Sequence, residues 1–272
     1  MVHNVHDRSF PPSSTSVPPG TEQPTLYSSI FYQTSFHRIA NVCYNRVISS
    51  PPATSEEVLS MNTTLMHWFA TLPEWIKPGT PSSRMYPNLD FSAHKLFWRY
   101  CNMRIILHRR AFLERALKGL PLSTDGLDVG ALGTMHAVDI DAACAAMCLE
   151  AASDSIKAIN QFLSSTRAVP NQLEWWYGLH FLFHASFVPL IASHTDISSP
   201  QRSEWRADVD RARATLIALK EDPLAERCLR IINQLAPSEQ PAASDALHDT
   251  SILSEMLQSN PGWSGDELAQ TW

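Results

Sequence analysis

One segment of the chain, residues 100–119 (YCNMRIILHRRAFLERALKG), limits the fold more than any other. It belongs to a helix predicted from about Asp90 to Lys118, and its apolar residues cover more than half of the helix surface. Leu96, Tyr100, Met103 and Leu107 form one stripe along this helix, and Ile106, Leu113 and Leu117 widen it. A helix with so wide an apolar surface must be buried on most sides. The chain therefore has to provide further helices that cover it.

A basic group interrupts this apolar surface. His108, Arg109 and Arg110 follow one another near the middle of the segment. Because an unpaired guanidinium is costly to bury, we expect Arg109 or Arg110 to pair with a carboxylate from a neighbouring helix. Two arginines beside one histidine are too few for a nucleic-acid surface.

The rest of the chain also shows helical patterns. Thr54 and Glu57 form a capping box at the start of one helix. Pro189 is expected to kink or end another, because proline lacks the amide proton. The further predicted helices cover about residues 26–49, 54–72, 137–165, 171–189, 199–220 and 222–236. No strand pairs or hairpin turns are evident, so the predicted fold class is all-α, an irregular multi-helix domain.

The two ends of the chain differ from this helical part. Residues 8–25 contain five prolines and are expected to be extended, as a proline-rich strap across the helices. Residues 237–272 contain six acidic residues and no lysine or arginine. We therefore expect a helical domain over residues 1–236, followed by a disordered or weakly helical acidic tail over residues 237–272.

The charge balance limits the classes of partner. The chain has a net charge of -6, with 27 acidic and 21 basic residues. Since six of the acidic residues lie in the tail, residues 1–236 carry 21 of each sign and are neutral. No basic face is indicated, so we expect no direct contact with nucleic acid. No run approaches about 18 apolar residues, and the five cysteines lack a disulfide-like spacing, so we expect a soluble intracellular protein without membrane contact.

Motifs for catalysis or metal binding are not evident. His180 and His184 have the spacing of metal ligands on a helix, but Phe181 stands where a zinc protease needs a glutamate. Cys144 and Cys148 share a helix face, yet no second pair of ligands accompanies them. The chain has no Gly-x-Ser-x-Gly elbow and no phosphate-binding glycine loop ending in Gly-Lys. We therefore predict that the protein is not an enzyme and holds no metal or cofactor.

The acidic tail has apolar residues among its carboxylates. The apolar residues that we expect to bind a partner are Ile252, Leu253, Met256, Leu257 and Trp263. Such alternation is typical of disordered activation segments that fold as an amphipathic helix on a partner protein. The same residues are compatible with an ordinary acidic terminus that carries one docked helix.

Seven segments, taken in order, resemble one family. They are HDRSFPPSSTSVPPGTEQPT, FHRIANVCYNRVISSP, VLSMNTTLMHWFATLPEWI, YCNMRIILHRRAFL, CLEAASDSIKAI, WWYGLHFLFHASFVPLI and DVDRARATLIALKEDPLAERCLRIINQL. Together they are similar to the C-terminal half of the regulatory (middle homology) region of fungal binuclear-zinc-cluster transcription factors. The third segment resembles that family's Leu…Trp…Leu-Pro signature at Leu65, Trp68, Leu72 and Pro73. In the fourth segment, Arg110 replaces the family's usual proline.

Two parts of that family's pattern are missing. Its zinc cluster needs six closely spaced cysteines, whereas the five cysteines here are separated by 58, 43, 4 and 80 residues. Zinc is therefore expected only if such a cluster lies upstream of residue 1. The earlier half of the regulatory region is missing as well, so a truncated, non-functional product is one alternative.

What the resemblance implies is an α-helical regulatory domain of a nuclear transcription regulator. Such a domain acts through coactivator or corepressor proteins and can respond to a small-molecule effector. If an effector site exists, we expect it on the aromatic helix, at Trp176, Tyr177, His180 and His184. Packing alone is the alternative explanation of these four residues. For the chain as a whole, a helical domain that binds a small molecule without regulating transcription is a further alternative.

Overall fold

The computed structural model describes residues 4, 16, 20–21, 23–25, 27–122, 137–165, 172–219 and 222–236. Met1–Leu235 form one compact unit, separate from Ala236–Trp272. The regular structure in the described residues consists of helices without a strand, which confirms the all-α prediction. None of these helices combines the length and the apolar character that crossing a membrane requires. The acidic tail predicted over residues 237–272 lies outside the described residues.

Seven α-helices and three short 3-10 helices make up the described part. They are α1 (Ser28–Ile48), α2 (Ser55–Ala70), η2 (Glu74–Ile76), η3 (Ser83–Met85), η4 (Pro87–Leu89), α3 (Asp90–Leu117), α4 (Ala137–Ser164), α5 (Gln172–Thr195), α6 (Arg202–Ala218) and α7 (Pro223–Leu235). The order and approximate bounds of the α-helices agree with those predicted from apolar periodicity.

Local sequence signals explain several helix ends. The capping box at the start of α2 is present, since Thr54 Oγ1 accepts from Glu57 N at 3.3 Å and Thr54 N donates to Glu57 Oε2 at 2.8 Å. Beyond the end of α3, Gly119 has a φ of 62°, in the left-handed region that glycine adopts readily. α5 continues through Pro189 to Thr195, so the helix does not end at the proline.

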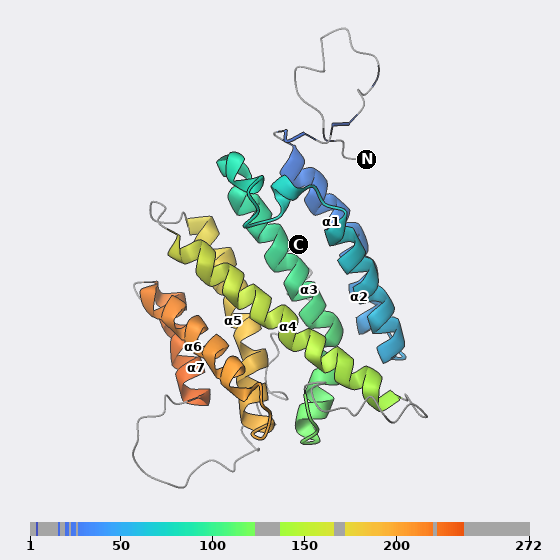
Figure 1. Ribbon diagram of the computed structural model, residues 1–272, viewed down its shortest axis with the longest axis vertical. Coiled ribbons are helices and arrows are strands. Elements are labelled where there is room, and N and C mark those ends of the chain that lie inside the picture. The colour runs from blue at the N-terminus through green and yellow to red at the C-terminus, as the bar shows by residue number, and fades with distance from the viewer. Residues whose placement is uncertain are drawn as a thin grey trace. The chain divides into compact units, whose positions relative to one another are not determined.

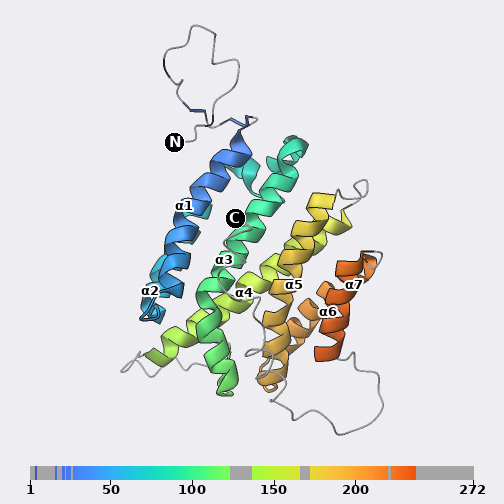
Figure 2. The same ribbon diagram turned by 180° about the vertical axis from the view of Figure 1, so that it is seen from behind.

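α3 is the central helix, as its wide apolar surface predicted. Every residue from Trp98 to His108 is buried, which requires neighbours on all sides of this stretch. Figure 1 shows α4 crossing in front of α3, and Figure 2, from behind, shows α1, α3 and α5 side by side. α2 also contacts α3. Because burying a large apolar side chain stabilises a fold by about 1.5–3 kcal/mol, α3 supplies much of the core.

α4 runs antiparallel to α3, whereas α1 and α5 run parallel to it. Phe91 near the start of α3 packs against Phe162 near the end of α4, with ring centroids 6.2 Å apart. Further along, Cys148 Sγ of α4 lies 3.9 Å from the carbonyl oxygen of Ile105. The parallel direction of α1 and α5 brings side chains from the early turns of both helices to the first half of α3.

Asn4 ties the segment before α1 to the start of that helix. The Asn4 side chain is buried, and its Nδ2 donates to Thr21 O at 2.6 Å and to Gln23 O at 3.0 Å. Its Oδ1 accepts from Ser28 Oγ, at the first residue of α1, at 2.8 Å. Most of the proline-rich strap predicted over residues 8–25 lies outside the described residues.

Candidate functional site

The four residues predicted for an effector site lie on α5. Trp176, His180 and His184 are spaced four residues apart and form one row. The rings of Trp176 and His180 are stacked with centroids 5.7 Å apart, and those of His180 and His184 are 4.4 Å apart. Trp176 keeps 40% of its surface exposed. Tyr177 leaves this row and faces α3.

Tyr177 contacts two cations of α3. Arg99 Nη2 donates to Tyr177 Oη at 3.4 Å, and Lys95 Nζ lies 5.1 Å from the centroid of the Tyr177 ring. Lys95 Nζ is also 5.5 Å from the centroid of the Phe91 ring. Contacts of this kind stabilise a partly buried ammonium by about 0.5–2 kcal/mol. Tyr177, one of the four residues predicted for an effector site, therefore lies beside two cations.

α1 completes this environment. Arg99 Nη1 lies 3.1 Å from His37 Nε2 and 3.2 Å from Gln33 Oε1. Since a guanidinium can only donate, His37 Nε2 must accept and carries no proton. We call Gln33, His37, Phe91, Lys95, Arg99 and Tyr177 the cationic cluster. It joins α1, α3 and α5 at one level of the central helix.

The cationic cluster holds like charges in a partly buried place. The pKa of Lys95 is lowered by burial and then by Arg99. Burial also lowers the pKa of Arg99, an effect that Tyr177 partly opposes. The pKa of His37 is lowered by burial, then by Arg99 and Lys95. For each of these groups the protonated form is disfavoured. An anion placed among them would stabilise the protonated forms.

His180 and His184 are both pushed toward their neutral forms. Burial lowers the pKa of His180. Burial, His180 and Arg109 together lower the pKa of His184 to about 4. In the part of the chain that the structure describes, no three side chains of metal-binding type come together. At neutral pH the two imidazole rings are uncharged, and their contacts are those of aromatic packing.

Arg104 makes the ion pair between α3 and α4. Its Nη2 donates to Glu150 Oε2 at 2.8 Å, and its Nε donates to Asn62 Oδ1 of α2 at 3.1 Å. Of the two arginines from which an interhelical pair was expected, Arg110 pairs instead with Glu114 within α3, with both side chains exposed. The reason is that the stretch of α3 covered on all sides ends before residue 110.

His108 is an unusual member of the core. It is fully buried, and neither of its ring nitrogens has a hydrogen-bond partner among the described residues. Burial, followed by the charge of Arg104, lowers the pKa of His108 to about 4. The histidine of the basic group is therefore a neutral core residue, because its surroundings disfavour the charged form.

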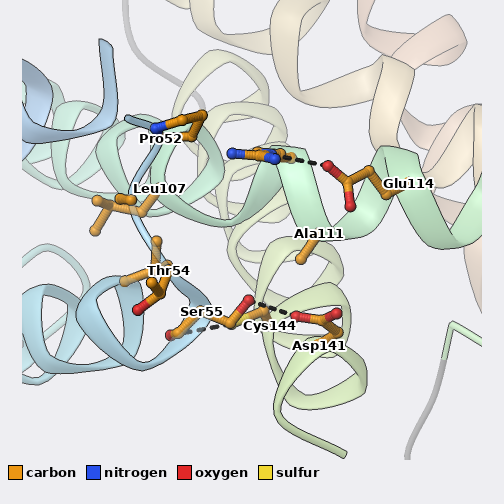
Figure 3. A pocket seen from close by; sticks show the side chains of 11 residues that line it. Pro52, Thr54, Ser55, Leu107, Ala111, Glu114, Asp141 and Cys144 are labelled. Atoms are coloured by element: carbon orange, nitrogen blue, oxygen red, sulfur yellow. Dashed lines mark hydrogen bonds and ion pairs between the residues drawn. The ribbon is translucent and has the colours of Figure 1, made fainter. Parts of the chain in front are cut away.

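A pocket of about 280 Å³ lies elsewhere, where the start of α2 faces α3 and α4 (Figure 3). Its polar lining includes Ser55 from α2, Glu114 from α3 and Asp141 from α4. None of the four residues predicted on α5 lines it. The volume is at the lower end of the range for small-molecule sites, which suits a ligand of few atoms.

The polar side chains of the pocket contact one another. Ser55 Oγ donates to the carboxylate of Asp141, and Cys144 Sγ lies 3.9 Å from the carbonyl oxygen of Ser55. Burial, then Asp141 and Glu56, raise the pKa of Cys144 to about 11, so the thiol stays protonated and is a poor nucleophile. The described lining contains no histidine, and the group that accepts from Ser55 Oγ is the carboxylate of Asp141.

Lys95, Arg99 and His37 were not among the site residues predicted from the sequence. A signal exists, since Lys95 and Arg99 are four residues apart in α3, and Gln33 and His37 have the same spacing in α1. Such spacing places each pair on one helix face. The spacing does not indicate which helix faces contact each other. The cationic cluster forms only because α1, α3 and α5 pack together.

Comparison with models of protein families, with characterised proteins and with solved structures finds no match to this chain. The residues predicted to bind a partner, namely Ile252, Leu253, Met256, Leu257 and Trp263, lie outside the described part of the chain. A proposal for the function of this chain thus rests on the geometry around α3 and on the sequence segments that form it.

Proposed function

We propose that this protein is a nuclear transcription regulator whose α-helical domain acts through coactivator or corepressor proteins and responds to a small-molecule effector. One observation carries the proposal: the segments that resemble the regulatory region of fungal binuclear-zinc-cluster transcription factors are those that form the core. Six of the seven segments lie in α1 to α7, in the family's order. Their signature residues Leu65, Trp68 and Leu72 are buried in the same cluster as α3.

The charge of the helical domain supports action through partner proteins. Residues 1–236 carry 21 acidic and 21 basic residues. Binding to DNA depends on neutralising phosphates with lysine and arginine, and a neutral domain supplies little of that attraction. The proposal therefore assigns DNA contact to a partner or to another segment, and it assigns no zinc or other cofactor to these residues.

The pocket between α2, α3 and α4 favours a second candidate function, a helical domain that binds a small molecule without regulating transcription. The side chains that line it would recognise the ligand in both cases. The two functions differ in their consequence, because only the first changes transcription when the chain is brought to a promoter.

A tethering experiment separates the two functions. The full chain is fused to an unrelated DNA-binding domain, and transcription of a reporter carrying its site is measured. We expect a several-fold increase over the DNA-binding domain alone, and loss of the increase when residues 237–272 are deleted. The control is Leu65→Asp, which places a carboxylate in the core and prevents folding. Transcription equal to that with the DNA-binding domain alone, neither raised nor lowered, would contradict the proposed function.

A further inference from the structure

We propose that the pocket between α2, α3 and α4 binds a small organic cation, a primary ammonium ion that carries a short apolar chain (Figure 3). The inference rests on the proposed function only where it names this cation as the effector. Binding itself follows from the volume, the lining and the charges of the pocket, and it is tested without DNA or a partner protein.

Asp141 gives the pocket a carboxylate that lacks a counter-charge. Three charged side chains line the pocket, namely Arg110, Glu114 and Asp141. Arg110 Nε and Glu114 Oε1 are 2.8 Å apart and form an ion pair. The Asp141 carboxylate accepts from the neutral hydroxyl of Ser55, and in the described part of the chain it makes no ion pair. One negative charge of the lining is therefore left for a ligand to neutralise.

Cys144 reports the sign of the charge in the pocket. Its thiol belongs to the lining, and its pKa is raised to about 11 by burial, then by Asp141 and Glu56. The two carboxylates disfavour a negative thiolate, and for the same reason they favour a positive group nearby. The start of α2 carries a partial positive charge, but the Asp141 carboxylate beside Ser55 offsets it. The pocket thus attracts cations.

The rest of the lining favours an organic cation over a metal ion. Among the described residues, no three side chains of metal-binding type come together. Figure 3 shows Asp141 toward one end of the pocket and Pro52 and Leu107 toward the other, and Val58 and Ala111 add further apolar surface. An ammonium group has three N–H donors for carboxylate and hydroxyl oxygens, and an alkyl chain attached to it would cover the apolar part. The volume of about 280 Å³ limits this chain to a few carbon atoms.

Titration of the full chain with three probes of equal chain length tests the inference. The probes are n-butylammonium, n-butanol and butyrate, at one ionic strength set with sodium chloride. Binding is measured by calorimetry and by the shift in melting temperature. We expect n-butylammonium to bind and to raise the melting temperature more than the other two probes do. An equal response to all three, a preference for butanol or butyrate, or no binding of n-butylammonium would overturn the inference.

A pair of variants tests the part played by Asp141. Asp141→Asn removes the charge and keeps an oxygen that can accept from Ser55, and it should weaken the binding of n-butylammonium about tenfold. Glu204→Gln removes a carboxylate from an exposed position of α6 outside the pocket, and it should leave the affinity unchanged. Equal weakening in both variants would overturn the assignment, since it would indicate attraction to the overall negative charge of the chain.

Ala111→Phe tests the cavity without changing a charge. Ala111 is half-buried and lines the pocket from α3, so a phenylalanine ring at this position would occupy its volume. We expect the variant to lose the binding of n-butylammonium although Asp141 and Glu114 are kept. Unchanged affinity would show that the cation binds elsewhere. Circular dichroism establishes that the variants fold, and Asp141→Asn and Ala111→Phe test the site independently if one of them does not.

The outcomes also separate this inference from the proposed function. A chain that binds n-butylammonium in the pocket but leaves the tethered reporter unchanged contradicts the proposed function alone. A chain that changes reporter transcription but does not bind n-butylammonium contradicts the cation site alone.

Discussion

Arg104 of α3 and Glu150 of α4 form an ion pair whose two partners have very different surroundings. Their Nη2 and Oε2 atoms are 2.8 Å apart, and the arginine side chain is 5% exposed while the glutamate side chain is 60% exposed. The glutamate thus reaches in from the surface to neutralise a cation of the central helix. A pair of this kind differs from an exposed one, because removing its outer member leaves a charge buried.

Glu150→Gln tests the importance of this pair for stability. Glutamine keeps the length of the side chain and one acceptor but removes the counter-charge of Arg104. We expect the free energy of unfolding to fall by about 1–2 kcal/mol. This loss is smaller than the loss on breaking a fully buried ion pair, because Glu150 is largely exposed. Urea unfolding followed by circular dichroism measures the change. The matched control, Glu114→Gln, breaks the exposed pair with Arg110 and should cost less than about 0.5 kcal/mol. Equal losses in both variants would contradict the account of α3 and α4.

Lys95→Met tests the conflict of charges in the cationic cluster. Burial and Arg99 lower the pKa of Lys95, so its charge opposes folding in the absence of an anion. Methionine has a similar length and no charge, and we expect the free energy of unfolding to rise in buffer that contains only chloride. Lys157→Met, at an exposed position of α4, is the control and should change little. A clear loss of stability in Lys95→Met would contradict this account, because it would mean that the ring contacts of the ammonium with Phe91 and Tyr177 outweigh its burial beside Arg99.

His108 gives a prediction for the dependence of stability on pH. Its pKa is about 4 in the folded protein, against an ordinary value of 6.5. Between these values the unfolded chain binds more protons than the folded protein, so the free energy of unfolding decreases as pH falls. The stability that depends on a neutral His108 is fully present above about pH 6.5. It declines as the pH falls toward 4, by up to about 3 kcal/mol in the free energy of unfolding.

The variant His108→Leu isolates this contribution. Between pH 6.5 and 4 its free energy of unfolding should decline less steeply than that of the original chain, because leucine does not bind a proton. At pH 7 it should be at least as stable, since leucine buries no polar atoms without partners. Parallel pH profiles for the two proteins would show that His108 does not stay neutral in the core.

The five cysteines should resist alkylation in the folded protein. All five are free and buried, and the absence of disulfide bonds agrees with their spacing in the sequence. Burial raises the pKa of Cys144 and of Cys228 to about 11, and it raises the pKa of Cys101 and Cys148 further. Since the thiolate is the reactive form, iodoacetamide at pH 8 should modify the chain only when urea is added. Mass spectrometry counts the modified thiols, and rapid labelling without urea would contradict the burial.

The sequence predicted the helices well because their signals are local. Thr54 and Glu57 are three residues apart and form the predicted capping box. Gly119 adopts the left-handed conformation expected beyond a helix end. The continuation of α5 through Pro189 was less predictable, because other contacts of a buried helix can outweigh the loss of one hydrogen bond.

The contacts between helices could not be predicted in the same way. Arg99 lies 62 residues from His37 and 78 from Tyr177 in the sequence, and Arg104 lies 46 from Glu150. Apolar periodicity identifies the buried face of each helix without naming the helix that covers it. For this reason Tyr177 was found as a candidate residue, whereas the cations beside it were found only in the structure.

Transcription from a reporter with the full chain tethered at its promoter is the most direct test of the proposed regulatory role. The account predicts a several-fold increase over the DNA-binding domain alone, and no increase with the unfolded Leu65→Asp variant. A level equal to that of the DNA-binding domain alone, with the folded fusion protein present in the nucleus, would contradict a role in transcription.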